Sequence, residues 1–212
     1  MRWDARTGAV RGSLLWGGST ASLVRVFVLG IDPGLSRCGY GCRESHASGP
    51  RAVAIGVIST APTQELPRRL ADLQRDLRAL VAELRPDVVA VERVFFQVNV
   101  RTAMSVGQAS GLAMAEAAAA GCEVVQYSPN QVKDAVAGHG GATKVEMERM
   151  VQTLLGITQP LRPVDAADAV ALALCHLARA PRLALVRQAE SRADGQAAPK
   201  PGATTGPEGR AR

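Results

Sequence analysis

"VFVLGIDPGLSRCGYG" runs from Val26 to Gly41 and predicts two strands joined by a short turn. Residues 26–31 are almost all apolar, as expected for a strand that is buried on both faces. That strand ends on a carboxylate, Asp32, which Pro33 and Gly34 follow directly. Asp-Pro-Gly is ordinary turn chemistry, so the acid alone has a purely structural explanation. A functional interpretation of Asp32 needs partners elsewhere in the chain.

The hydrophobic pattern beyond this stretch predicts an α/β fold with a mixed sheet and helices on both faces. Strands are expected at 26–31, 38–43, 52–58, 87–91 and 123–127. A first helix is expected at 66–84, where leucines recur at alternating spacings of four and three. Further helices are expected at 101–120, after the capping-box residues Ser128 and Thr143, and from Pro163 to about Arg179.

The two ends of the chain differ in composition from the middle. The 212 residues allow one domain with a real core, which we place at 24–184. The leader 1–23 is rich in Gly, Ser and Arg and holds both tryptophans, so we expect it to lie outside the fold and the true start to be at Val24 or Val26. The tail 185–212 has the composition of a disordered segment.

Several classes of protein are disfavoured by composition. The chain has no run of about 18 apolar residues, so no membrane partner is expected. Charged residues at Asp4, Arg6 and Arg11 interrupt any signal-peptide core. The four cysteines show no CxxC spacing and no paired histidines, which argues against zinc. We therefore expect reduced thiols in a cytoplasmic protein.

The charge is concentrated at the ends. The whole chain has a net charge of +6, but residues 26–186 carry sixteen basic and fifteen acidic side chains. A surface for an anionic partner such as DNA must therefore be a local patch on the domain rather than a global field.

Acids recur at places where an open α/β sheet builds its sites. Glu92 follows the predicted strand 87–91, just as Asp32 follows its own strand. Asp165 and Asp168 are three residues apart in an otherwise apolar helix, so they lie on one face of it. Neighbouring buried carboxylates need a compensating charge, and oxygen-only ligands favour Mg²⁺ or Mn²⁺. The sequence therefore predicts a divalent-metal site.

Each acid has a simpler explanation when it is taken alone. Asp165 suits the positive end of a helix dipole, and Glu92 could pair with Arg93 or Arg101. A purely structural explanation for all four acids together is weaker, because three separate elements would each have to carry an acid at this position by coincidence.

Five ordered blocks together resemble the RuvC family of Holliday junction resolvases. They are "GIDPGLSRCGYG", "VERVFFQVN", "VGQASG", "QVKDAVAGHGGATK" and "VDAADAVALALCHLA", and they span roughly Val26 to Arg179. The resemblance implies a ribonuclease-H-like fold, a homodimer, Mg²⁺-dependent cutting of four-way DNA junctions and coupling to the RuvA–RuvB branch-migration complex. By motif position, the family's catalytic acids correspond to Asp32, Glu92, Asp165 and Asp168. Two metal ions per site, with Mn²⁺ as a substitute for Mg²⁺, agree with this chemistry.

Aromatic and basic residues near the acids are candidates for binding DNA. Phe95 and Phe96 follow Glu92 directly; packing is the usual fate of Phe, but an aromatic ring beside a nuclease site can also stack on a base. By resemblance, Phe95 is the residue that wedges into the junction. Lys133 and Lys144 lie near the starts of two capped helices, where free amides and lysine together favour phosphate, although solvated surface lysines are the alternative.

The glycine-rich stretch "GHGGATK" does not have the spacing of a Walker A loop. His139 within it is expected to serve as a loop or phosphate contact rather than a metal ligand, since it has no partner histidine. Three rival functions compete with this interpretation. An actin-like ATPase or sugar kinase would need a second large domain, for which about 155 core residues leave no room. The four acids argue against a junction-binding protein without catalysis, whereas a nuclease for other branched or RNA substrates stays open.

Overall fold

The computed structural model describes residues 26–44, 51–93 and 100–196. The predicted leader 1–23, both Phe95 and Phe96, and residues 197–212 of the predicted tail lie outside these ranges. The chain divides into two units, Met1–Arg179 and Ala180–Arg212, and the first of them contains the sheet.

Five strands and five helices make up the described part of the chain. In chain order they are β1 (Phe27–Asp32), β2 (Arg37–Glu44), β3 (Arg51–Ser59), α1 (Leu66–Leu84), β4 (Val88–Glu92), α2 (Val100–Ala119), β5 (Glu123–Tyr127), α3 (Pro129–Ala137), α4 (Lys144–Leu155) and α5 (Val164–Gln196). The predicted bounds of α1 and β5 are confirmed, and those of the other strands and of α2 differ by one residue at either end.

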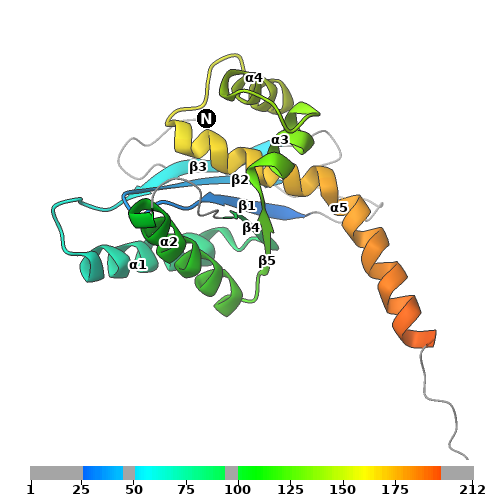
Figure 1. The fold of residues 1–212 in the computed structure, drawn as a ribbon, viewed down its shortest axis with the longest axis horizontal. Coiled ribbons are helices and arrows are strands. Elements are labelled where there is room, and N and C mark those ends of the chain that lie inside the picture. The colour runs from blue at the N-terminus through cyan, green and yellow to red at the C-terminus, as the bar shows by residue number, and fades with distance from the viewer. Residues whose placement is uncertain (1–25, 45–50, 94–99, 197–212) are drawn as a thin grey trace, which may run out of the picture. The chain divides into compact units, whose positions relative to one another are not determined.

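The strands form one mixed sheet in the order β3-β2-β1-β4-β5 (Figure 1). β1, β2 and β3 are antiparallel neighbours, whereas β1, β4 and β5 run parallel. The carboxyl ends of β1, β4 and β5 therefore meet at one edge of the sheet, and β1 and β4 are immediate neighbours there. This topology confirms the predicted mixed α/β fold.

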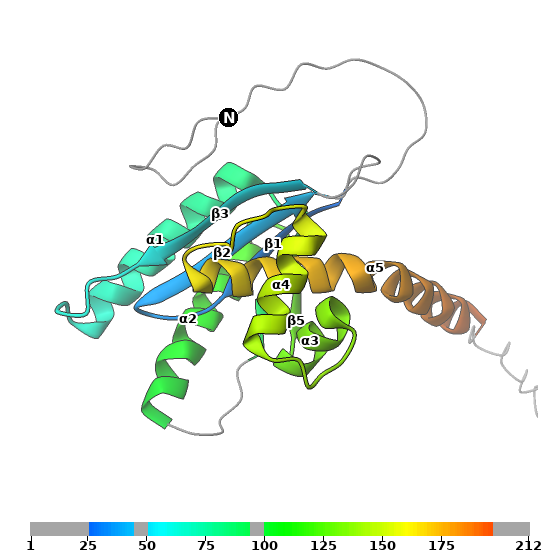
Figure 2. The ribbon, with the colours of Figure 1, turned by 90° about the horizontal axis from the view of Figure 1, so that it is seen from above.

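Helices cover both faces of the sheet, as predicted (Figures 1 and 2). Successive residues of β1 point to opposite faces, so Leu29 belongs to the core with α1 and α2, and Val28 belongs to the core with α3, α4 and α5. The first core includes Leu73 and Leu77 of α1, both fully buried. Burying both faces explains why β1 reads as a nearly continuous apolar run.

The helix starts confirm the predicted capping boxes. Ser128 accepts a hydrogen bond from the backbone N–H of Gln131, whose side chain accepts from the N–H of Ser128. Thr143 and Glu146 make the same reciprocal pair at the start of α4. Each cap satisfies amides that the first turn of a helix otherwise leaves unbonded.

The predicted end of the last helix is wrong. We expected it near Arg179, but α5 continues to Gln196, into the stretch predicted to be a disordered tail. The segment from 182 to 193 is mostly Ala, Leu, Arg, Gln and Glu, which are good helix formers, and this local preference outweighed the low hydrophobicity that suggested disorder. Among the helices of the described ranges, none combines the length and the apolar composition needed to cross a membrane.

Candidate active site

The ends of β1 and β4 deliver two acids side by side. Ile31 of β1 pairs with Val91 of β4 in the parallel register, so the next residues, Asp32 and Glu92, end their strands side by side. The two carboxyl groups lie close enough for each to shift the pKa of the other. The structure thus brings together the two strand-end acids that the sequence predicted.

In this corner, the acids at the ends of β1 and β4 repel one another, and the pKa values of Asp32 and Glu92 are raised. Burial raises the pKa of Asp32 to about 7, and the charges of Glu92, Asp168 and Asp165 add to the rise. Burial and the charge of Asp168 also raise the pKa of Glu92, although its interaction with the Asp32 carboxyl group opposes that rise. Carboxyl groups crowded in this way are stabilised by a proton or by a cation.

Helix α5 reaches this corner because glycines let its backbone lie directly on the sheet. A Cβ atom at Gly39 of β2 would overlap the carbonyl oxygen of Asp165, and one at Gly30 of β1 would overlap the carbonyl oxygen of Ala169. At Gly41 a Cβ would run into Val170. These three contacts, which we call the glycine seam, place the acidic turn of α5 next to the end of β1. Sequence reasoning missed the seam.

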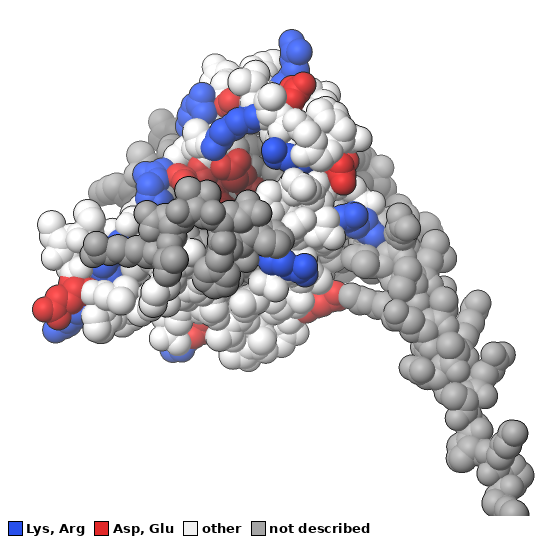
Figure 3. All heavy atoms as spheres, in the orientation of Figure 1, with Lys and Arg blue, Asp and Glu red and all other residues white. Residues whose placement is uncertain are grey.

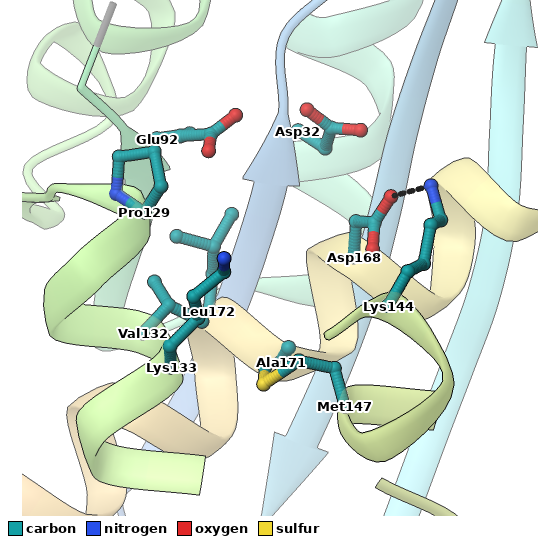
Figure 4. A pocket seen from close by; sticks show the side chains of 10 residues that line it. All are labelled: Asp32, Glu92, Pro129, Val132, Lys133, Lys144, Met147, Asp168, Ala171 and Leu172. Carbon is teal, nitrogen blue, oxygen red and sulfur yellow. Dashed lines mark hydrogen bonds and ion pairs between the residues drawn. The ribbon is translucent and has the colours of Figure 1, made fainter. Parts of the chain in front are cut away.

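Three of the four predicted acids line one cavity of about 330 Å³. Figure 4 shows Asp32, Glu92 and Asp168 around it, with the amine of Lys133 pointing into the same space. The complete lining is Asp32, Glu92, Pro129, Val132, Lys133, Lys144, Met147, Asp168, Ala171 and Leu172. The strand ends, α3, α4 and α5 therefore converge on a single site.

Asp165, the fourth acid, is not among the residues that line the cavity. Its Oδ2 accepts hydrogen bonds from both Nε and Nη2 of Arg37, each at 2.8 Å. Arg37 is the first residue of β2, five residues after Asp32. Sequence reasoning did not identify it, and its position just beyond the Asp-Pro-Gly turn was the available signal.

Both predicted lysines face the acids. Lys144 opens α4 and places its Nζ 3.4 Å from Oδ2 of Asp168, as the dashed line in Figure 4 shows. Lys133 is the fifth residue of α3 and lines the same cavity. On the face shown in Figure 3, acidic atoms gather in a hollow with Lys and Arg atoms around it. The local basic patch expected from the charge distribution is therefore present around the acids.

A second arginine fixes the turn that follows Asp32. Arg69 of α1 donates to Ser36 Oγ at 2.6 Å and to Thr60 Oγ1 at 3.0 Å. The buried Thr60 hydroxyl in turn donates to the carbonyl of Leu35 at 2.6 Å, and its backbone N–H donates to the carbonyl of Ser36. This network, which the sequence alone did not reveal, joins α1 and the end of β3 to the β1–β2 turn.

The donor set fits a hard divalent cation. All four candidate ligands are carboxylates, and oxygen donors of this kind are what Mg²⁺ and Mn²⁺ prefer. Within the described ranges, however, no three His, Cys, Asp or Glu side chains are gathered closely enough to hold one ion. Two of the four carboxylates are engaged by basic side chains, Asp165 by Arg37 and Asp168 by Lys144.

The remaining predicted contacts are only partly described. His139 is exposed in the loop between α3 and α4 and does not line the cavity, so its role as a phosphate contact stays a prediction. Phe95 lies in the undescribed segment 94–99, which directly follows Arg93 at the end of β4. Its role therefore also stays a prediction.

Comparison with known proteins agrees with this arrangement. The family described as "Crossover junction endodeoxyribonuclease RuvC" matches residues 28–176. A protein of that description from Salinispora arenicola is 56% identical over 153 residues, which cover 72% of this chain and 87% of the relative. The structure of Thermus thermophilus RuvC superimposes with a TM-score of 0.69 at 36% identity and covers 74% of this chain and 96% of that chain. T. thermophilus RuvC in complex with a Holliday junction substrate gives 0.69 at 37% identity, over 73% and 94% of the two chains.

The α/β fold with a mixed sheet is therefore the ribonuclease-H-like fold that the resemblance implied. The comparisons also exclude the ATPase alternative, because the match covers nearly the whole sheet and helix arrangement and most of each relative. The chain belongs to the RuvC family of crossover junction endodeoxyribonucleases.

Proposed function

We propose that the chain resolves Holliday junctions by nicking DNA strands symmetrically, as a Mg²⁺-dependent endonuclease of recombination and DNA repair. The observation that carries the proposal is the cavity in which Asp32, Glu92 and Asp168 meet Lys133 and Lys144. Acids for a metal and cations for phosphate in one open site suit phosphodiester hydrolysis. Membership of a nuclease family that depends on divalent metal supports it.

The four acids are proposed as the catalytic residues and metal ligands. Asp32 lies centrally at the end of β1, with Glu92 on one side and Asp165 and Asp168 on the other. Two Mg²⁺ ions, or Mn²⁺ in their place, would supply an activated water and stabilise the leaving oxygen of an in-line displacement. The protein's own contribution is rigid placement: the strand ends fix one pair of acids, and the glycine seam fixes the other.

Three further residues are proposed to hold the DNA. Lys133 and Lys144 point into the cavity beside the acids, where they would bind the phosphates flanking the scissile bond. Phe95 is proposed to stack on a base at the junction, and that assignment depends on the sequence resemblance alone. Pro33 and Gly34 turn the backbone away from Asp32, which leaves space for a phosphate to approach.

A homodimer is proposed because symmetric nicks need two active sites. Helix α2 is the candidate interface: Met104 is 58% exposed, and the space around Gly107 and Gly111 is open for at least 4 Å. Its opposite side is anchored to α1, where Glu116 accepts hydrogen bonds from Arg78 and Gln74. Sedimentation of the purified chain at several concentrations tests the dimer.

The cellular setting follows from the same proposal. A junction resolvase acts on chromosomal DNA, so we place the protein in the cytoplasm. A branch-migration complex of the RuvA–RuvB type is its proposed partner, since such a motor delivers the four-way junctions that a resolvase cuts.

The decisive experiment compares a synthetic four-way junction with a linear duplex of matched sequence, in Mg²⁺ and in EDTA. Paired nicks at symmetric positions, seen only in the junction and only with Mg²⁺, are expected. Binding without nicks would instead favour a junction-binding protein that lacks catalysis. Equal cutting of an RNA-containing or other branched substrate would overturn the assignment to Holliday junctions.

A further inference from the structure

Arg37 and Asp165 form an ion pair at the edge of the proposed metal site. Nε and Nη2 of the guanidinium both lie 2.8 Å from the same atom, Oδ2 of Asp165. Both N–H groups converge on one carboxylate oxygen, and the flexible ammonium of lysine lacks the planar, rigid donor fork that makes this contact. The oxygen that Arg37 occupies is therefore one that a metal ion would otherwise use.

The position of Asp165 is consistent with this competition. Asp32, Glu92 and Asp168 line the cavity, but Asp165 does not, and in the described residues no three acids are clustered closely enough for one ion. Asp165 is nevertheless near enough for its charge to raise the pKa of Asp32. A short movement of its side chain away from Arg37 would bring a fourth carboxylate toward the cavity.

The ion pair is well placed to be exchanged. The Arg37 side chain is 52% exposed and that of Asp165 is 33% exposed. Ion pairs of this exposure contribute little to stability, because water screens them and the arginine loses conformational freedom. A divalent cation attracts the carboxylate with twice the charge and can displace the guanidinium.

We propose that Arg37 is a positioning residue that holds Asp165 until a divalent cation displaces it, and that the freed guanidinium then binds a DNA phosphate. The proposal depends on the proposed metal-dependent nuclease function. It makes metal binding and phosphate binding at this corner linked events, because one arginine cannot serve Asp165 and a phosphate at once. Lys144 and Asp168 form a longer ion pair, of 3.4 Å, about one helical turn further along α5.

Metal binding by the DNA-free protein tests the first step. Titration calorimetry with Mn²⁺ is expected to show about two- to five-fold tighter binding by Arg37→Gln than by the unchanged protein, the range that an exposed ion pair commands. Arg37→Lys is expected to lie between them. Arg75→Gln is the matched control, because Arg75 is an exposed arginine of α1 paired with Asp72 and Asp76. It should leave the Mn²⁺ affinity unchanged.

A double-mutant cycle separates competition from a general effect of charge. In an Asp165→Asn background, replacing Arg37 by Gln should no longer alter Mn²⁺ affinity. If Arg37→Gln binds Mn²⁺ no more tightly than the unchanged protein, or tightens binding equally in both backgrounds, the competition is refuted. Absence of Mn²⁺ binding in the unchanged protein would instead refute the proposed function itself, so the two failures are distinguishable.

Junction binding tests the second step. Affinity is measured by fluorescence anisotropy against salt, in EDTA and in Ca²⁺, an ion with the same preference for oxygen ligands. In Ca²⁺, the logarithmic salt slope of Arg37→Gln should be shallower by about 0.9, which corresponds to one lost phosphate contact. In EDTA, where Asp165 holds the guanidinium, the slopes should agree. Equal slopes in Ca²⁺ would overturn the phosphate step, and thermal melting of each variant excludes misfolding as the cause.

Discussion

Gly39 lies so close to the backbone of Asp165 that a Cβ atom there would overlap the Asp165 carbonyl oxygen. Gly39 also stands opposite Asp32 in the antiparallel pairing of β1 and β2. One glycine thus connects the acid at the end of a strand to the acidic turn of α5, and the geometry of the site depends on their direct contact.

Gly39→Ala is therefore expected to lower the free energy of unfolding by about 1–3 kcal/mol, because α5 must move away from the sheet to admit the methyl group. The cleavage rate should fall by a larger factor than the loss of stability alone would cause, since Asp165 and Asp168 move with the helix. Urea denaturation and a junction-cleavage assay measure the two effects. Gly141→Ala is the control: its Cβ would meet His139 Nδ1 at an ordinary 3.7 Å. Unchanged stability and cleavage in Gly39→Ala would contradict the close contact.

Asp168→Asn is expected to abolish cleavage and to tighten junction binding in EDTA. The substitution removes a proposed metal ligand, and it also releases Lys144 from the ion pair across the cavity. Glu92→Gln should also abolish cleavage but should change metal-free binding less, because Glu92 interacts with another acid, Asp32, whereas Asp168 pairs with a lysine. Gel-shift titration beside a cleavage assay distinguishes the two variants. Cleavage near the normal rate in either variant would exclude it as a ligand.

The pKa of Asp32 predicts a pH dependence of stability without metal. The folded value is about 7 against an ordinary 3.8, so the folded protein binds the proton more tightly than the unfolded chain. This contribution is complete below pH 3.8 and is lost as the pH rises to 7, on the order of 4 kcal/mol in all. Denaturation in EDTA is measured between pH 5 and pH 8 for the unchanged protein and for Asp32→Asn, which lacks this titrating group. The free energy of unfolding should decline more steeply with pH in the unchanged protein. Parallel curves for the two proteins would refute the shift.

Arg69→Ala is expected to reduce stability by about 1–2 kcal/mol, because it removes hydrogen bonds to Ser36 and Thr60 that hold the turn after Asp32. The cleavage rate should fall with little change in junction affinity, since the turn positions Asp32 rather than the DNA. Thermal melting, single-turnover cleavage and anisotropy measure the three quantities. The exposed neighbour Arg68, replaced by Ala, is the control for stability. A fall in affinity alone would show that Arg69 binds DNA directly.

Phe95→Ala should cut junctions poorly while its melting temperature stays near normal, since stacking on a base typically contributes about 1–3 kcal/mol to binding. Phe96→Ala should affect cleavage less. A melting temperature that drops by many degrees in Phe95→Ala would instead identify the residue as part of the core.

The sequence was sufficient to predict whatever depends on local pattern. Apolar runs bounded by turn residues predicted the strands, leucine spacing predicted α1, and the capping boxes at Ser128 and Thr143 predicted the starts of α3 and α4. Acids at strand ends and at a helical spacing of three were visible for the same reason. A clear hydrophobic repeat identifies a helix or a strand with little ambiguity.

Residues that act through tertiary contact were not predictable in this way. Arg37 became relevant only when β2 and α5 were placed together, and Arg69 only when α1 was packed beside the β1–β2 turn. Apart from the position of Arg37 just beyond the Asp-Pro-Gly turn, the local sequence does not distinguish these two arginines from other arginines of the chain. The glycines at 30, 39 and 41 had the same ambiguity, because a glycine in a strand signals a close approach without naming the partner.

The glycine seam has a consequence for how the active site can change its dimensions. Asp165 and Asp168 lie one helical turn apart, so a rigid slide of α5 along its axis moves both acids together and leaves their mutual spacing unchanged. The distances from both to Asp32 and Glu92 change at the same time, by at most about 1.5 Å for each residue of slide. The register of α5 against β1 and β2 therefore sets the separation between the pair Asp32 and Glu92 and the pair Asp165 and Asp168.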